Sequence, residues 1–239
     1  MGKKKKIADR IWTVVLTILA LLYVYPIIMI LFNSLKKETT ITTAGAFTLP
    51  TADGFAGLEN YATVLRNPYF SIAIKNTLLF AVVTTLGKVI FGMALALLVN
   101  QRFHGVNYMR TVFFLPAVLN NVAVGLVFRS MMHPSGLINQ TLSAMGLDML
   151  MHNWLTDAKI AIFSCAFVEI WKWTGYTMVI FLAGLQSIDK TYYEAAQLDG
   201  ATYWQQLRSV TIPLIMPALN NAVVISVVGG LKVFDIVQS

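Results

Sequence analysis

The 239-residue sequence has few charged residues: they make up 12% of it, whereas 57% of its residues are hydrophobic. A soluble domain of this length would contain about 25% charged residues. So few charges cannot cover a globular surface in water, and the composition therefore predicts a membrane protein. The formal net charge is +7, but the basic residues form no stripe and are not part of a nucleic-acid-recognition motif. This argues against nucleic-acid binding.

Cysteine and clustered histidine are also scarce. Cys165 is the only cysteine, and the three histidines at positions 104, 133 and 152 are far apart. Neither a disulfide within the chain nor a metal site is predicted, and Cys165 should act as a small buried hydrophobe. A phosphate-binding loop is missing as well, because Gly87-Lys88 lacks both the earlier glycine and the following Ser or Thr. The chain is therefore not expected to bind ATP or to hold a cofactor of its own.

What the chain does contain is five long apolar runs. The first, 11–32, follows a basic segment at 1–10, and as a helix of about 33 Å it would cross a hydrocarbon core of about 30 Å. A cleaved signal peptide would have a shorter apolar region, so this run is interpreted as an uncleaved anchor. No run alternates with a period of two residues, which favours membrane helices over barrel strands. The other runs are 77–99, 112–132, 160–185 and 212–231.

The distribution of basic residues predicts the orientation. Four lysines and Arg10 precede the first run, and such a segment stays in the cytoplasm. Counting crossings from there places 33–76 and 133–159 outside, and 100–111 and 186–211 inside. The short loop 100–111 contains Arg102 and Arg110 and no acidic residue, as expected of an inside loop.

The loop 186–211 has helix signals of its own. Ser187 and Asp189 are candidate N-caps for a helix over Lys190–Leu198, because their side chains can accept hydrogen bonds from the first turn. Gly200 suits the left-handed position that follows a helix end. Thr202 and Gln205 match a capping box that opens a second helix near Tyr203. The loop is thus predicted to be helix, glycine turn, helix, with Pro213 marking entry into the last apolar run.

The faces of these two helices suggest a docking element. On the first helix Glu194 points away from the side with small residues, and it can pair with a partner's Arg or Lys. An amphipathic loop lying in lipid headgroups is the alternative, but only Lys190 and Arg208 are basic, which is few for a membrane-surface helix. The small side chains of the first helix, which would let another protein surface approach closely, lie on the side with Tyr192, Ala195 and Ala196. The second helix has an apolar stripe of Tyr203, Leu207 and Val210.

The spacing of this loop resembles the EAA motif of binding-protein-dependent ABC transporter permeases. In that motif EAA is followed by three residues, Gly, nine residues and I-x-L-P. Here it reads Glu194-Ala195-Ala196, Gly200 and Val210-Thr211-Ile212-Pro213, with Asp199 before the glycine, Val for Ile and Ile for Leu. From about residue 57 onward, further segments are similar to the maltose-type, sugar-importing branch of the family. Of the two permease subunits in such systems, they are more similar to the one that resembles permeases for multiple sugars and glycerol phosphate. They are GLENY 57–61, NTLLF 76–80, RTVFFLPAV 110–118, FLAGLQSI 181–188 and LKVFD 231–235.

The resemblance implies an all-α integral membrane protein with the helical bundle of a type I ABC importer permease, over 77–239. Permeases of this family continue to a sixth crossing, so five crossings indicate a C-terminal truncation. The implied subunit is non-catalytic and lies in a bacterial cell membrane. Its implied partners are a second homologous permease, a dimer of a cytoplasmic ATPase that uses the ATP, and an extracellular solute-binding protein. The residues implied to couple to the ATPase are Glu194, Ala195, Ala196, Asp199, Gly200, Val210, Ile212 and Pro213.

Polar residues inside the apolar runs are candidates for the substrate path, because burying them in a membrane is costly. Glu169 and Lys172 are spaced to meet on one helix face, either as a self-neutralising pair or at the substrate. Lys88 is interpreted as a lysine that faces the bundle or snorkels. Amides can join helices or bind sugar hydroxyls, and joining is favoured; aromatic rings can stack on sugars. The amides are Asn120, Asn121, Asn220 and Asn221, and the aromatics near Lys172 are Trp171, Trp173 and Tyr176.

Two other functions stay open. A stand-alone secondary transporter or channel would explain the buried charges but not the capped loop with family spacing, and a membrane receptor or scaffold would explain neither. A permease for a solute other than a sugar is a further alternative, because the sugar assignment rests on the resemblance.

Overall fold

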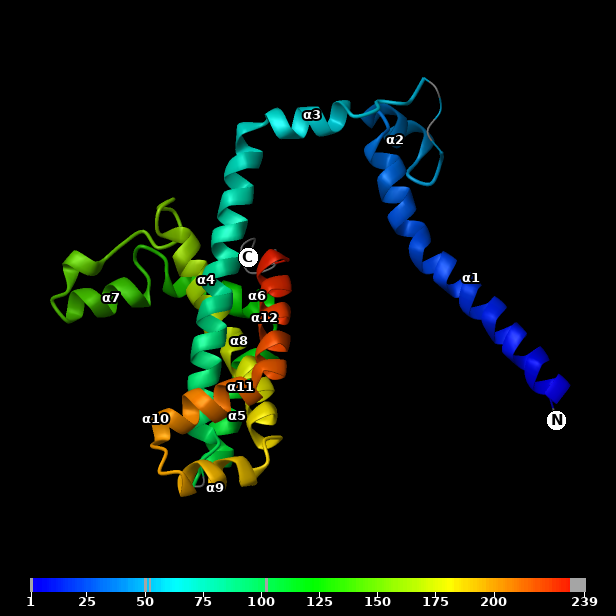
Figure 1. The fold of residues 1–239 in the computed structure, drawn as a ribbon. Coiled ribbons are helices and arrows are strands. Elements are labelled where there is room, and N and C mark those ends of the chain that lie inside the picture. The colour runs from blue at the N-terminus through cyan, green and yellow to red at the C-terminus, as the bar shows by residue number, and fades with distance from the viewer. Residues whose placement is uncertain (1, 50, 52, 102, 233–239) are drawn as a thin grey trace. The chain divides into compact units, whose positions relative to one another are not determined.

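The computed structural model describes residues 2–49, 51, 53–101 and 103–232, and its regular elements in that part of the chain are helices (Figure 1). The chain divides into two compact units, residues 1–73 and 74–239. The helices are α1 Gly2–Ser34, α2 Glu38–Ala44, α3 Glu59–Arg66, α4 Pro68–Val99, α5 Val106–Val118, α6 Asn121–Met131, α7 Leu137–Ala144, η1 Asp148–Leu150, α8 Ala161–Gln186, α9 Lys190–Leu198, α10 Tyr203–Gln206, η2 Leu207–Thr211, α11 Ile212–Leu214 and α12 Met216–Leu231.

In the first unit, α1 is one long apolar helix whose far end has a polar cap. Lys36 is fully buried there, and its ammonium donates to Asn33 Oδ1 at 2.8 Å and to the Thr48 carbonyl. Asn60 Nδ2 donates to the carbonyls of Ser34 and Lys36, at 2.9 and 2.8 Å. These bonds satisfy backbone carbonyls where the chain leaves α1 and link that end to α3.

The second unit is a helical bundle centred on α8. Its main core contains Ala96 and Val99 from α4, Met178 and Phe181 from α8, and Ala222 from α12. Many other apolar side chains of the unit are exposed, including Leu86 and Phe91 on α4 and Val224 on α12. Apolar surface of this extent requires an apolar surrounding, which a lipid bilayer provides.

Among the described residues, two helices, over Asp9–Ser34 and Pro68–Val99, are each long and apolar enough to cross a membrane, and the number rises to four if each of two bent pairs forms one span. The five-crossing prediction is therefore not confirmed. Helix α8 is 26 residues long but is not among these spans, because Glu169, Lys172 and neighbouring polar residues lower its mean hydropathy. Helix α4 begins at Pro68, nine residues before the apolar run 77–99.

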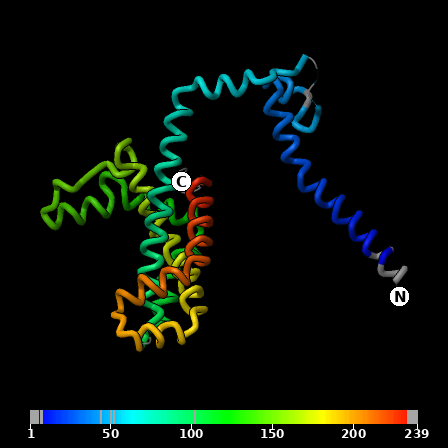
Figure 2. The backbone as a smooth tube through the Cα atoms, viewed as in Figure 1, coloured from blue at the N-terminus to red at the C-terminus, as the bar shows by residue number. Residues whose placement is uncertain are grey.

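Two of the predicted membrane helices, over 112–132 and 212–231, are each broken by a bend. Helices α5 and α6 meet at 93°, and the stretch Tyr203–Leu214 meets α12 at 67°. The tube in Figure 2 follows the chain through these turns. Ile212 and Pro213 thus belong to the end of the loop rather than to α12. The segment LKVFD runs beyond residue 232, and its last residues lie outside the described part of the chain.

Candidate functional site

The first loop helix is capped as the sequence predicts. Helix α9 spans Lys190–Leu198, and Asp189 is its N-cap, with Oδ1 accepting from the Thr191 amide at 3.0 Å. The hydrogen bonds from Thr191 hold the pKa of the Asp189 carboxyl below its usual value. Of the two candidate caps, Asp189 is therefore confirmed. Ser187 instead ends α8, where its hydroxyl donates to the Gly184 carbonyl at 2.7 Å.

A glycine turn ends α9. Gly200 has φ +76°, the left-handed conformation that disfavours residues with a β-carbon. The Gly200 amide donates to Gln197 O at 3.0 Å, and the Ala201 amide donates to Ala196 O at 2.9 Å. This pair of bonds is a Schellman motif, which satisfies the last carbonyls of the helix. The predicted role of Gly200 as the turn residue is confirmed.

The second loop helix begins at Tyr203 behind a capping box, as predicted. The Gln205 side-chain oxygen accepts from the Thr202 amide at 2.7 Å. The helix then widens into a π-helical stretch, η2, and continues through α11. Tyr193 on α9 and Thr211 share a hydrogen bond of 3.1 Å between their hydroxyls. The two loop helices are therefore tied together near their bases, and the glycine turn sets their angle.

The tip of the loop exposes both charge and apolar surface. Glu194 and Ala195 are exposed and Ala196 is half-buried, while Leu198 is 90% exposed and Trp204 is 74% exposed. In the predicted stripe of the second helix, Leu207 and Val210 are half-buried but Tyr203 is exposed. The loop thus presents a mixed surface with no cover from the described part of its own chain.

The buried charges in the bundle are paired differently from the prediction. Glu169 Oε1 lies 3.1 Å from Lys88 Nζ on α4, so the ion-pair partner of Glu169 is Lys88 and not Lys172, which was one of the two alternatives given for these residues. Lys88 faces the bundle, one of the two interpretations given for it, and also donates to Ser226 O on α12 at 3.4 Å. Lys88 and Glu169 are 81 positions apart in the chain, so local spacing could not indicate that they interact.

Lys172 and Asn120 lie at the break between α5 and α6. The Lys172 ammonium donates to the carbonyls of Leu119 and Pro116, the latter at 3.4 Å. Asn120 Oδ1 accepts from the amides of Val122 and Ala123, at 2.8 and 3.3 Å, so it caps its own helix rather than joining two helices. Asn121 follows as the first residue of α6, and Asn220 and Asn221 are exposed on α12.

The aromatic residues beside Lys172 form two separate contacts. Trp173 and Tyr176 meet edge to face with ring centroids 6.0 Å apart, and the Lys172 ammonium lies 5.3 Å from the Trp173 ring centroid. Trp171 packs instead against Phe128 of α6, at 5.2 Å. Trp173 and Tyr176 are therefore the two rings of the group that lie together.

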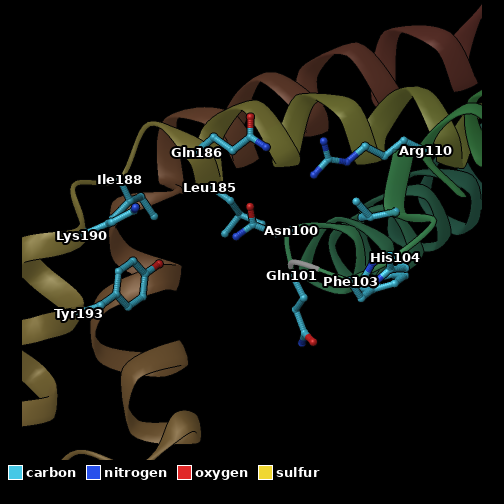
Figure 3. A pocket seen from close by; sticks show the side chains of 11 residues that line it. Asn100, Gln101, Phe103, His104, Arg110, Leu185, Gln186, Ile188, Lys190 and Tyr193 are labelled. Atoms are coloured by element: carbon cyan, nitrogen blue, oxygen red, sulfur yellow. The ribbon is translucent and has the colours of Figure 1, made fainter. Parts of the chain in front are cut away.

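A cleft beside the loop was missed by sequence reasoning. It has a volume of about 770 Å³ and lies between the end of α4, the turn before α5 and the start of α9. In Figure 3, Asn100 and Gln101 stand across from Lys190 and Tyr193, with Arg110 reaching in from α5. Arg110 Nη2 donates to Val99 O at 2.7 Å. The walls come from two stretches of chain that are distant in sequence, so no local signal could have revealed this cleft.

A bundle of broken apolar helices interrupted by a capped two-helix loop is the architecture of a multi-pass membrane permease. The chain belongs to the family described as "Binding-protein-dependent transport system inner membrane component", which matches residues 88–239. The family resemblance read from the EAA spacing is thereby confirmed.

Two curated relatives are sugar permeases by name. Lactose transport system permease protein LacF of Rhizobium radiobacter is 36% identical over 184 residues, which cover 76% of this chain and 61% of that protein. Trehalose/maltose transport system permease protein MalF of Thermococcus litoralis is 30% identical over 223 residues, which cover 93% and 72%. The chain spans only 61–63% of the length of three relatives that each match over 184 residues.

A solved structure has the same fold. The crystal structure of a bacterial alginate ABC transporter, in complex with alginate pentasaccharide-bound periplasmic protein, contains a chain that matches with a TM-score of 0.75 and 27% identity. The match covers 98% of this chain and 76% of that chain. The agreement therefore extends over nearly the whole of this sequence.

Proposed function

We propose that this chain is the membrane permease subunit of an ABC importer for a sugar or oligosaccharide. The sugar class is supported by the names of the relatives, which transport lactose, trehalose and maltose, and by the alginate transporter with the same fold. The periplasmic protein in that complex supports a solute-binding protein as a partner. A second permease and a pair of ATPase subunits complete the proposed assembly, and the ATPase hydrolyses the ATP.

The loop 186–211 is proposed to couple the permease to its ATPase. The observation that carries this proposal is the geometry of the loop: two capped helices, joined by a left-handed glycine, present an exposed carboxylate and exposed apolar side chains. A rigid, self-capped element with such a surface suits docking to a protein, because little conformational entropy is lost on binding. Glu194, Ala195 and Ala196 would face the ATPase, while Asp199 and Gly200 set the angle of the second helix. Val210, Ile212 and Pro213 would transmit its movement to α12.

In the proposed topology the N-terminus and this loop lie in the cytoplasm, and all five apolar runs cross the membrane. Helix α8 is included because its ions are compensated within the bundle: Glu169 pairs with Lys88, and Lys172 meets backbone carbonyls. The proposed substrate path runs past Trp173 and Tyr176, whose rings can stack on a sugar. The exposed amides Asn220 and Asn221 could bind sugar hydroxyls on that path.

A charge reversal with a matched control tests the coupling. Glu194→Lys reverses the charge at the exposed loop surface, and Gln197→Lys adds a lysine at another exposed position of the same helix. We expect Glu194→Lys to lower both co-purification of the ATPase and ATP-driven uptake, measured with radiolabelled maltose, trehalose and lactose. Gln197→Lys should have a much smaller effect.

The outcomes separate the alternatives. Normal uptake and normal co-purification in Glu194→Lys would mean that the loop is only a connector. Uptake by the purified chain without any ATPase would instead support a stand-alone transporter. Uptake of none of the three sugars by an assembled, ATP-hydrolysing complex would point to a different solute.

A further inference from the structure

The break between α5 and α6 requires partners for its backbone groups. Helix α5 ends at Val118, α6 begins at Asn121, and the residues between them are extended, with ψ 146° at Leu119 and 135° at Asn120. Such a break leaves the last carbonyls of one helix and the first amides of the next without intrahelical partners. The two helices together are long and apolar enough for one bent span. Inside a bilayer, therefore, the partners must come from the protein.

One half of the break is closed locally. The side-chain oxygen of Asn120 accepts from two amides in the first turn of α6. This is an ordinary N-cap, and it fixes where α6 begins because it satisfies donors that would otherwise be unpaired.

The other half is closed partly by the Leu119 amide, which donates to the Pro116 carbonyl at 3.2 Å, and partly by a residue from a different helix. Lys172, midway along α8 and 1% exposed, donates to the carbonyls of Pro116 and Leu119 at the end of α5. The C-terminal end of a helix carries partial negative charge, which stabilises a cation placed there. A buried ammonium would be costly without such partners, so lysine and helix end satisfy one another.

Two features leave Lys172 available for this position. The direct ion pair of Glu169 is with Lys88, so the ammonium of Lys172 is free to donate its hydrogen bonds elsewhere. One turn further along α8, Gly175 lies so close to α5 that a β-carbon there would overlap the backbone of Phe113 and Phe114. The absence of a side chain at Gly175 lets the two helices approach closely enough for Lys172 to reach the carbonyls.

We propose that Lys172 is a positioning residue which, together with Asn120, keeps α5 and α6 as two half-helices at nearly a right angle. Its ammonium holds the carbonyl end of α5. The inference goes beyond the proposed transport function, because it concerns a bend within this chain and holds whatever solute is carried.

A distance measurement tests the inference directly. In the permease assembled with its partner subunits in lipid nanodiscs, Cys165→Ala removes the one cysteine of these 239 residues. Tyr108→Cys and Ser130→Cys then provide exposed positions for spin labels on α5 and α6. An uninterrupted helix from Tyr108 to Ser130 would be about 33 Å long. The bend should give a distance several ångströms shorter by pulsed electron resonance. We expect Lys172→Met to lengthen or broaden this distance distribution and Lys172→Arg, which keeps the donors, to preserve it.

Unchanged distances in Lys172→Met would overturn the inference, as would an Arg variant that is as disturbed as the Met variant. If Lys172→Met does not accumulate in membranes, the Asn120 pair gives an independent answer. Asn120→Ala should lengthen or broaden the distribution, whereas Asn120→Asp, which keeps the capping oxygen, should not; no change in Asn120→Ala overturns the inference. The distance is read without any substrate, so failure of an uptake assay and failure of this inference are distinguishable.

Discussion

Lys88 Nζ lies 3.1 Å from Glu169 Oε1, with both side chains at most 4% exposed, and this ion pair joins α4 to α8. The same ammonium donates to the Ser226 carbonyl on α12. One lysine thus connects three helices of the bundle. In an apolar surrounding this connection is strong only while both ions are present, because each compensates the other's loss of hydration.

Removal of one ion should therefore cost more stability than removal of both. We expect Lys88→Met and Glu169→Leu each to lower the free energy of unfolding by about 3–5 kcal/mol, whereas the double variant should lose much less. Thermal unfolding of the purified chain in detergent measures these differences as a double-mutant cycle. Lys75→Met, at an exposed position of α4, is the control and should leave the transition unchanged. Additive effects of the two single substitutions would contradict the pairing.

The contact between α5 and α8 should depend on Gly175. A β-carbon at this position would overlap backbone atoms of α5, and backbone cannot move aside as a flexible side chain can. We expect Gly175→Ala to destabilise the bundle by about 1–3 kcal/mol, seen as a lower unfolding midpoint. Gly229→Ala is the matched control, because its β-carbon would meet only Lys88 Nζ, at 3.8 Å. Equal midpoints for the two variants would show that the close approach is not required.

The glycine turn of the loop should tolerate asparagine but not valine. The space around a β-carbon at Gly200 is open, with no atom within 4 Å, so the cost of a substitution comes from the left-handed backbone alone. That cost is about 1–2 kcal/mol for most residues and less for Asn. Gly200→Val should raise hydrogen exchange in 189–211 and lower ATP-driven uptake, while Gly200→Asn stays close to the parent. The unfolding midpoint of the bundle should not move in either variant.

The proposed orientation is tested by labelling in intact cells. With Cys165 replaced by Ala, Ser135→Cys should react with a membrane-impermeant thiol reagent, whereas Ser187→Cys should react only after the membrane is opened. Both serines are exposed, so burial in the protein does not explain a difference between them. The opposite labelling pattern would reverse the topology.

The loop could be predicted from the sequence because its determinants are local. Asp189 accepts from an amide two residues away, Gly200 supplies its own left-handed backbone, and Gln205 reaches back three residues to Thr202. Each of these interactions closes within one helical turn, so residue type and spacing suffice to predict it. The family spacing from Glu194 to Pro213 is a pattern of the same local kind.

The bends and the buried contacts could not be predicted in this way. The polar residues Asn120 and Asn121 interrupt the run 112–132, but the break at Asn120 is satisfied partly by Lys172, more than fifty positions away. Spacing along α8 offered only Lys172 as a partner for Glu169, whereas the ion pair is made with Lys88 on another helix. The interactions of Lys172 and Glu169 depend on which helices lie side by side, as does the cleft beside α9.

The sequence by itself thus determined that the chain is a helical membrane protein of the permease family and that its loop is capped helix, glycine, capped helix. Composition and short-range hydrogen bonding carry that information, because neither depends on the arrangement of the helices. Tertiary structure alone decided that α5 and α6 form a right-angled pair, that Glu169 meets Lys88, and that Lys172 meets the end of α5. The physical reason is that a buried charge or an unpaired carbonyl takes whichever partner the packing brings within hydrogen-bond distance. Here the close approach of α8 to α5 at Gly175 supplies that partner for the end of α5.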